Sequence, residues 1–295
     1  MTAKQHGMHL PFTPQLEQQL AAWLAEDLGR GDLTAAALAG RPGRAHWLAK
    51  ADGVFCGGVL VEPLFRLLDP AVRVCPLVAD GETVGMGQRL LELQGPATAL
   101  VAAERTALNL AMRLSGIATA TAALVQMLEG TGVALADTRK TTPGLRVLEK
   151  YAVRCGGGVN HRFGLDDAAM LKENHLAWAA GVAGGLEAAI AAVRANGPWP
   201  ARVIVEAETG AEAAAAVRAG ADGVLLDEFT PGQLVELVPR LRALAQGRGL
   251  VLEASGVQPG QIQAYASSGI DLISTSAPIT RSPWLDLSMR FDRDS

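Results

Sequence analysis

The sequence is poor in aromatic residues and carries little net charge. Phe, Trp and Tyr together make up 4% of its 295 residues, too few to alternate with basic residues along a nucleic-acid surface. The formal net charge of −4 gives the chain no general attraction for polyanions. These deficits argue against a nucleic-acid-binding protein, and any basic site must be local.

Signals for membrane insertion or export are also missing. The chain has no run of about 18 consecutive apolar residues, the length that would predict a membrane helix. Residues 1–11 lack the apolar stretch and cleavage site of a secretory signal. The three cysteines, Cys56, Cys75 and Cys155, form no CxxC pair, and their odd number fits a reducing compartment better than a disulfide framework. We therefore expect a soluble cytoplasmic protein.

Apolar side chains are abundant. Hydrophobic residues make up 49% of the chain and charged residues 19%, which provides for a real core and excludes wholesale disorder. The length predicts two domains, or one large α/β barrel with an appendage.

The first half of the chain combines helices with a small sheet. Thr13 and Pro14 suit the start of a helix whose leucines recur at helical spacing up to Gly29. A second helix is predicted over about 98–114, followed by Ser115 and Gly116. From 45 to 93, short apolar runs alternate with Gly, Asp-Pro and Asp-Gly turn signals, which indicates a small sheet with hairpins.

After residue 130, short apolar segments alternate with helix-compatible stretches. Repeated strand–helix units joined by short loops predict a parallel sheet, and six or seven of them suffice to curl into a barrel. The predicted strands are 133–136, 168–171, 203–205, 224–226, 250–252 and 270–273. The clearest helices are 144–154, 211–219, 231–245 and 259–267.

Polar residues follow the predicted strands. In a barrel of parallel strands these positions gather at the carboxyl-terminal mouth, where the active sites of such folds lie. The residues are Asp137, Arg139, Lys140, Lys172, Glu206, Asp227, Ser255 and Ser274 to Ser276. One carboxylate after a strand is often only a helix cap, but six successive strand ends with such groups favour a shared site.

Cations concentrate between residues 138 and 162, which hold six Lys or Arg and one Glu. Arg146, Lys150 and Arg154 follow helical spacing, and we interpret them as a solvated helix face. Two further pairs, 139–140 and 161–162, flank that helix near the predicted mouth. Arginine there suits an acidic small molecule, because the guanidinium binds carboxylate or phosphate in bidentate fashion.

Other groups extend the candidate site. Glu206 and Asp227 end consecutive strands and suit either a hard divalent cation such as Mg²⁺ or ribose hydroxyls. Lys172 follows a buried strand, where a lysine needs an anionic partner or a Schiff-base role. Small residues within the segments 253–256 and 274–276 let backbone N–H groups approach a phosphate. No zinc-ligand spacing, GxGxxG or GxSxG is present.

Several motifs then resemble one family. Residues 137–146 read DTRKTTPGLR, residues 149–158 read EKYAVRCGGG, and residues 160–162 read NHR. Further matches are EDLGRGD at 26–32, AERTALN at 103–109, KENH at 172–175, LLD at 225–227, EASG at 253–256 and DLSMRF at 286–291. These motifs resemble the quinolinate phosphoribosyltransferase family over nearly the whole chain.

The resemblance implies a type II phosphoribosyltransferase. The expected architecture is an N-terminal α/β sandwich, residues 1–115 with 277–295 returning to it, and an incomplete parallel α/β barrel, residues 116–276. The expected reaction joins quinolinate to 5-phosphoribosyl 1-diphosphate with Mg²⁺ and gives nicotinate mononucleotide, diphosphate and CO₂. The resemblance also implies a homodimer in which the N-terminal domain of one chain caps the barrel mouth of the other.

Site residues carry over by matching motif. The expected quinolinate ligands are the partner subunit's Arg105, and Arg139, His161, Arg162 and Lys172 of the same chain. The expected phosphoribosyl diphosphate ligands are Lys140, Glu206, Asp227, Ser255, Gly256, Thr275 and Ser276, with Glu206 and Asp227 also serving Mg²⁺. The expected catalytic residues are Lys140, Lys172, Glu206 and Asp227.

Some positions depart from the family pattern. Glu228 stands where Asn is usual, Val257 replaces a second glycine, Ile204 replaces the first Glu of a Glu-x-Glu strand, and Ser276 lies in a loop that commonly contains glycine. These changes keep two alternatives open. One is a phosphoribosyltransferase for a different aromatic acid, and the other is a catalytically silent module that binds the acid without turnover.

Overall fold

The computed structural model describes residues 9–172, 175 and 185–292. The chain forms two compact units. Unit 1 comprises Met1–Ala122, Val147–Gly157 and Arg281–Ser295, and unit 2 comprises Ala123–Arg146 and Gly158–Thr280. The sequence-based domain boundaries stay a prediction.

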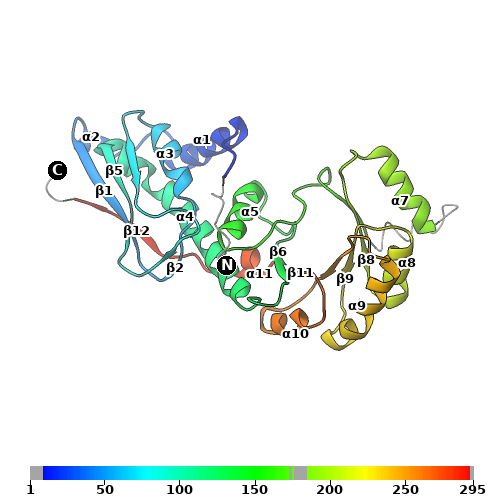
Figure 1. The fold of residues 1–295 in the computed structure, drawn as a ribbon. Coiled ribbons are helices and arrows are strands. Elements are labelled where there is room, and N and C mark those ends of the chain that lie inside the picture. Colours follow the sequence, from blue (N-terminus) through cyan, green and yellow to red (C-terminus); the bar gives the residue numbers. More distant parts are fainter. Residues whose placement is uncertain (1–8, 173–174, 176–184, 293–295) are drawn as a thin grey trace. The chain divides into compact units, whose positions relative to one another are not determined.

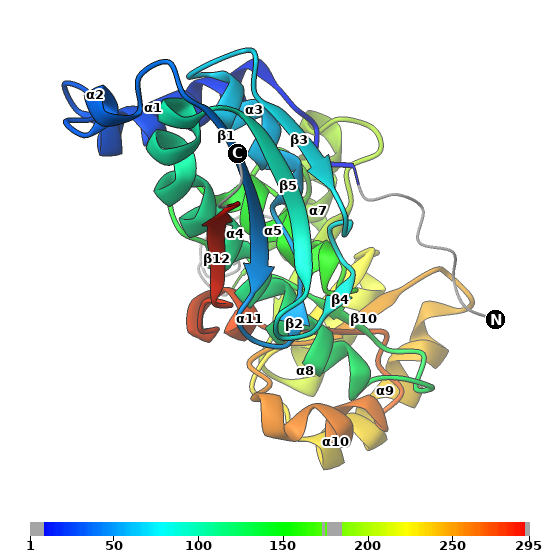
Figure 2. The same cartoon turned by 90° about the vertical axis from the view of Figure 1, so that its left-hand side faces the viewer.

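Unit 1 contains an antiparallel four-stranded sheet in the order β12-β1-β5-β3 (Figure 2). The small sheet predicted over 45–93 is therefore confirmed, although a helix at Val61–Arg66 interrupts the segment and the first strand pairs with none of its immediate successors in the chain. Its strands are β1 (Pro42–Ala49), β3 (Arg73–Pro76), β5 (Arg89–Pro96) and β12 (Leu287–Phe291), and β2 (Gly53–Val54) pairs with β4 (Thr83–Val84). The helices are α1 (Pro14–Leu28), α2 (Ala35–Leu38), η1 (Gly58–Leu60), α3 (Val61–Arg66), most of α4 (Ala97–Gln126) and α5 (Arg146–Cys155).

Helix α1 has the start and end that its sequence predicts. The Thr13 hydroxyl accepts a hydrogen bond from the Leu16 N–H at 3.2 Å, and Pro14 occupies the first turn. Leu16, Leu20 and Leu24 are buried on one face. Gly29 ends the helix at a positive φ of 53°, a conformation that glycine adopts without a Cβ clash.

Helix α4 corrects the predicted helix over 98–114, because it continues to Gln126 through Ser115 and Gly116. Ser115 is fully buried, and its hydroxyl exchanges hydrogen bonds with the backbone N–H and C=O of Cys56. A Cβ at Gly116 would lie 2.1 Å from the Pro283 carbonyl oxygen. These small residues serve close packing against distant segments, so they do not end the helix.

Helix α4 is also long and apolar enough to cross a membrane by length and composition. Half of its apolar window is buried inside the structure, and the core helix of a soluble protein passes the same test. The helix therefore carries only weak evidence for a membrane span.

Helix α5 corrects the predicted solvated face of Arg146, Lys150 and Arg154. Arg154 is exposed, but Lys150 and its neighbour Glu149 are fully buried. Glu149 accepts a hydrogen bond from the Arg113 guanidinium of α4 at 2.8 Å. Lys150 in the middle of the cationic stretch is therefore packed inside unit 1, whereas Arg154 remains on the surface.

All three cysteines are free; Cys56 and Cys155 are buried, whereas Cys75 is exposed. Burial, reinforced by the neighbouring Cys155 and Asp80, raises the pKa of the Cys56 thiol well above its ordinary value. The Cys56 thiol is therefore protonated at neutral pH when no metal is bound.

Unit 2 is a parallel six-stranded sheet in the order β6-β11-β10-β9-β8-β7. Its strands are β6 (Ala134–Ala136), β7 (Ala169–Leu171), β8 (Val203–Ala207), β9 (Gly223–Leu226), β10 (Val251–Ala254) and β11 (Leu272–Ser274). Each lies within a few residues of its predicted position. The consecutive strands β6 and β7 stand at opposite ends of this order, so the sheet is an incomplete barrel, as predicted.

Helices follow the strands of this sheet along the chain. They are α7 (Gly185–Asn196), α8 (Gly210–Arg218), α9 (Pro231–Ala245), α10 (Ile262–Ala266) after the short η2 (Pro259–Gln261), and α11 (Ala277–Arg281). Capping boxes start α8 at Thr209 and α9 at Thr230. α8 lies against β8 and β9, with α9 beside it (Figure 1).

Candidate functional site in the open barrel

Strand alternation decides which side chains enter the barrel. Along β8, Val203, Val205 and Ala207 belong to the core under the helices. Because successive side chains point to opposite faces, Ile204 and Glu206 face inward, and Ile204 lines an interior cavity. Glu253 on β10 and Asp227 after β9 follow the same alternation. The barrel interior therefore carries carboxylates.

Lys172 and Glu206 form an ion pair. The Lys172 ammonium donates to the Glu206 carboxylate at 2.5 Å, with 43% of the lysine side chain exposed and 9% of the glutamate. Glu206 on the neighbouring strand is thus the anionic partner that the position of Lys172 predicts. One member of the pair is buried while the other remains accessible to a ligand.

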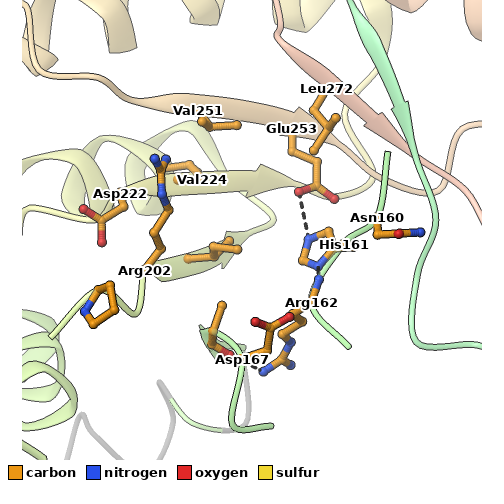
Figure 3. A pocket seen from close by; sticks show the side chains of 14 residues that line it. Asn160, His161, Arg162, Asp167, Arg202, Asp222, Val224, Val251, Glu253 and Leu272 are labelled. Atoms are coloured by element: carbon orange, nitrogen blue, oxygen red, sulfur yellow. Dashed lines mark hydrogen bonds and ion pairs between the residues drawn. The ribbon is translucent and has the colours of Figure 1, made fainter. Parts of the chain in front are cut away.

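The segment 160–162 is held by two buried carboxylates. Asp137, 2% exposed, accepts hydrogen bonds from the Asn160 side-chain amide at 2.7 Å and the His161 backbone N–H at 2.8 Å. Glu253, 3% exposed, lies 3.2 Å from His161 Nε2 (Figure 3). His161 Nδ1 accepts from the Arg162 backbone N–H at 2.9 Å, which leaves Nε2 as the ring nitrogen that faces Glu253.

Arg162 and Arg139 act on each other. The Arg162 guanidinium donates to the Ala168 carbonyl at 2.9 Å. Partial burial, and then repulsion from Arg139, lower the pKa of Arg162. Two cations held near each other in this way favour an anion between them. Lys140 is exposed beside Arg139, and its backbone N–H donates to the Thr138 hydroxyl.

The loop that follows β10 passes beside Asp227. A Cβ at Gly256 would lie 3.6 Å from the Asp227 carboxylate, and Gly256 has a φ of +74°, so the loop after β10 passes close to that carboxylate. The Ser255 N–H is bonded to the Leu226 carbonyl, and the Thr275 N–H to the Ala136 carbonyl. These two amides therefore serve the sheet, and a phosphate must use other donors of the two loops.

The departures from the family pattern also have structural positions. Glu228 is exposed at a φ of 59°, a left-handed conformation in which Asn is better tolerated than Glu. Val257 is 2% exposed and belongs to the core of unit 2, and Ser276 stands just before α11.

A cavity of about 370 Å³ lies inside unit 2. Its lining includes Arg202, Asp222 and Val251, which stand at the amino-terminal ends of their strands, together with Asn160, His161, Arg162 and Glu253 (Figure 3). The cavity thus differs from the predicted mouth, which lies at the opposite ends of the strands. Among the described residues, Glu253 Oε1 has no hydrogen-bond partner.

The sequence patterns did not indicate every residue of the site, and one predicted ligand belongs to unit 1. Glu253 belongs to one of the family-like motifs, and its two-residue spacing from Val251 places its side chain inward. Arg202 and Asp167 also line the cavity. The only sequence feature that could have indicated them is their position just before predicted strands. Arg105 is exposed on α4 in unit 1, whereas the other predicted ligands belong to unit 2. Residues 173 and 174 of the KENH motif lie outside the described residues.

An open barrel of parallel strands, with carboxylates inside it and lysine and arginine brought to it by loops, defines an α/β-barrel enzyme for small anionic substrates. Residues 117–290 match the C-terminal domain of quinolinate phosphoribosyl transferase, and residues 32–115 match its N-terminal domain. The chain belongs to the quinolinate phosphoribosyl transferase family.

Relatives and solved structures agree with this assignment. A probable carboxylating nicotinate-nucleotide pyrophosphorylase of Synechocystis is 43% identical over 95% of this chain and 93% of its own length. The human carboxylating nicotinate-nucleotide pyrophosphorylase is 36% identical over 96% of this chain and 94% of its own. The crystal structure of NadC from Streptococcus pyogenes matches with a TM-score of 0.86 and 37% identity over 96% of this chain and 98% of its own.

Proposed function

We propose that this chain transfers the phosphoribosyl group of 5-phosphoribosyl 1-diphosphate to quinolinate. The products are nicotinate mononucleotide, diphosphate and CO₂, a step of NAD biosynthesis. The family and the names of the relatives support this reaction. The observation that carries it is the meeting of cations with inward carboxylates in one open barrel, above all the Lys172–Glu206 pair.

Quinolinate is a dianion, and the cations suit it. Arg139 and Arg162 are permanently charged and repel each other, so a carboxylate between them relieves the repulsion and gains bidentate hydrogen bonds. Lys172 is proposed to add charge from the end of β7, and His161, whose ring lies between Glu253 and the Arg162 backbone N–H, is proposed to line the site of the acid. The partner subunit's Arg105 is proposed to add a further cation.

The remaining residues of the predicted site are proposed to bind the ribose and phosphate groups. Glu206 and Asp227 are proposed to bind the ribose hydroxyls, Lys140 to face the diphosphate, and the loops at 255–256 and 275–276 to hold the 5′-phosphate. The oxygen donors of Glu206 and Asp227 on neighbouring strands fit Mg²⁺, which prefers a few carboxylates plus substrate phosphates. When bound, Mg²⁺ neutralises charge on the departing diphosphate.

The reaction then requires positioning more than covalent help from the protein. The bond from ribose carbon 1 to the diphosphate breaks, and the electron pair leaves with the diphosphate beside Lys140. The pyridine nitrogen forms the new bond to that carbon and becomes cationic. The bond between the ring and the adjacent carboxylate then breaks, and CO₂ leaves. The electron pair stays on that ring carbon, stabilised by the neighbouring cationic nitrogen, and takes up a proton from solvent. Electrostatic positioning by the carboxylates and lysines supplies the stabilisation that each step needs.

A product assay tests this proposal. The purified chain, with 5-phosphoribosyl 1-diphosphate and Mg²⁺, is incubated with quinolinate or with nicotinate. We expect nicotinate mononucleotide and CO₂ from quinolinate and negligible turnover of nicotinate. Turnover of nicotinate alone would establish a phosphoribosyltransferase for another acid. Tight quinolinate binding without diphosphate release would establish a silent binding module.

We further propose a cytoplasmic homodimer with shared sites. If Arg105 acts across the dimer, mixing inactive Arg105→Ala and Lys172→Ala chains restores part of the activity, because one site in the mixed dimer then keeps both native residues. Product formation is measured after subunit exchange has been demonstrated with differently tagged chains. Exchange without any recovery would contradict the shared site.

A further inference from the structure

Unit 1 contains a cluster of potential metal ligands that the proposed reaction does not use. Cys56 Sγ, Cys155 Sγ and an Asp80 carboxylate oxygen all lie within 4.8 Å of one another. Cys56 follows β2, Asp80 precedes β4, and Cys155 ends α5. We propose that these three side chains bind a zinc ion.

The ligand chemistry selects the metal. Zinc binds thiolate sulfur at about 2.3 Å and carboxylate oxygen at about 2.0–2.2 Å. Any two of its ligand atoms therefore lie at most roughly 4.6 Å apart. The three ligand atoms of this cluster, all within 4.8 Å of one another, come close to that spacing. Two sulfur ligands disfavour Mg²⁺ and Ca²⁺, which prefer oxygen. A carboxylate beside two thiols also favours zinc over a purely sulfur-seeking ion such as Cu⁺.

The carboxylate is already oriented. Asp80 Oδ1 accepts a hydrogen bond from the Gly58 N–H at 2.8 Å, and Oδ2 accepts from the Gly57 N–H at 3.0 Å and from the Tyr151 hydroxyl at 2.9 Å. Carboxylates that ligate metals are held by outer hydrogen bonds of this kind. The cluster is therefore supported on one side by backbone and on the other by a side chain of α5.

The two glycines make room for this arrangement. Gly57 has a φ of +104°, and a Cβ at Gly58 would lie 3.0 Å from Asp80 Oδ1 and 2.8 Å from the Phe55 ring. Any other residue at 58 would push against the carboxylate. Cys56 is fixed as well, because its backbone N–H and C=O are both bonded to the buried Ser115 hydroxyl. The ligands are thus preorganised before an ion arrives.

Binding is a simple exchange with a local consequence. One Zn²⁺ displaces the protons of two thiols, which go to solvent, and nothing is oxidised or reduced. Asp80 is only half-buried, so it provides the route of entry and leaves the fourth position to water. The ion fastens the end of α5 to segment 55–58 and to the turn at Asp80. The glycines 156–158 and the segment 160–162 follow directly in the chain.

The test uses the full-length chain, reduced and stripped of metal by a chelator. We expect one Zn²⁺ per chain, and Co²⁺ in its place gives the charge-transfer absorption of a cobalt–thiolate bond. Cys56→Ser and Cys155→Ser abolish that absorption and weaken zinc binding at least about 100-fold, since even outer-shell partners are worth about 10–100-fold. Cys75→Ser is the matched control, because Cys75 is exposed and outside the cluster, and it behaves like the unchanged chain.

X-ray absorption of the zinc-loaded unchanged chain gives a measurement that needs no variant. Two sulfur neighbours at about 2.3 Å are expected. A zinc environment of oxygen and nitrogen alone would overturn the proposal, as would failure to bind stoichiometric zinc. Zinc binding that survives Cys155→Ser but is lost in Cys75→Ser would also overturn it, because the ion would then sit at the exposed thiol.

Discussion

Two ion pairs, one in each unit, show how differently the chain uses charge. In unit 1, Arg113 and Glu149 lie 2.8 Å apart with 18% and 0% of their side chains exposed. In unit 2, Lys172 and Glu206 lie 2.5 Å apart with 43% and 9% exposed. The first pair is largely buried, whereas the second presents its lysine to solvent. We infer that the first serves stability and the second serves substrate.

Removing Glu149 should produce the largest change in stability. Glu149→Ala leaves the largely buried Arg113 without this carboxylate, and breaking a buried pair costs about 3–5 kcal/mol. Urea unfolding measures the loss. Glu62→Ala is the control, because its pair with Arg66 is exposed and such pairs contribute about 0–1 kcal/mol. Equal losses for the two variants would erase the distinction between buried and exposed pairs.

Arg162→Ala should weaken quinolinate binding without unfolding the chain. A hydrogen bond to a charged group is worth about 1.5–3 kcal/mol, which corresponds to roughly 10–150-fold in the dissociation constant. Titration calorimetry with quinolinate measures the change, with Arg218→Ala on the surface of α8 as the control. Unchanged affinity in Arg162→Ala would remove this residue from the substrate pocket.

Substitutions at two glycines, one in tight packing and one facing open space, should give the smallest changes in stability. Gly116→Ala drives a methyl group into the Pro283 carbonyl, and overpacking of this kind costs about 1–3 kcal/mol. At Gly232 in α9, a Cβ meets nothing within 4 Å, so Gly232→Ala should stabilise by about 0.4–1 kcal/mol. Thermal melts of both variants give the two signs, and a stable Gly116→Ala chain would refute the close contact.

The sequence predicted the strands of unit 2 well because each is a short apolar run bounded by turn residues. It failed at Ser115 and Gly116, which resemble a helix end, because the need for small residues there comes from Cys56 and Pro283, far away in the chain. Lys150 was misread for a similar reason: helical spacing specifies a face but not what covers it. Tertiary packing decided both positions.

The candidate site was predictable in part. Parallel strands bring their ends to one edge, so Glu206 and Lys172 could be expected to lie together before any coordinates. Glu253 could have been found from its two-residue spacing from Val251. The hydrogen bonds that hold His161 could not, because Asp137 and Glu253 come from strands that only the sheet order places around it. The substrate roles of these residues stay predictions.

Glu206→Gln tests the central claim most directly, because it keeps the size of the side chain and removes the charge that we assign to catalysis. The rate of nicotinate mononucleotide formation from quinolinate should fall by about 100–1,000-fold, the usual cost of losing one electrostatic contact to a transition state. The urea concentration at the midpoint of unfolding, measured on the same variant, should stay nearly unchanged. A variant that folds and keeps the rate of the unchanged chain would contradict the account.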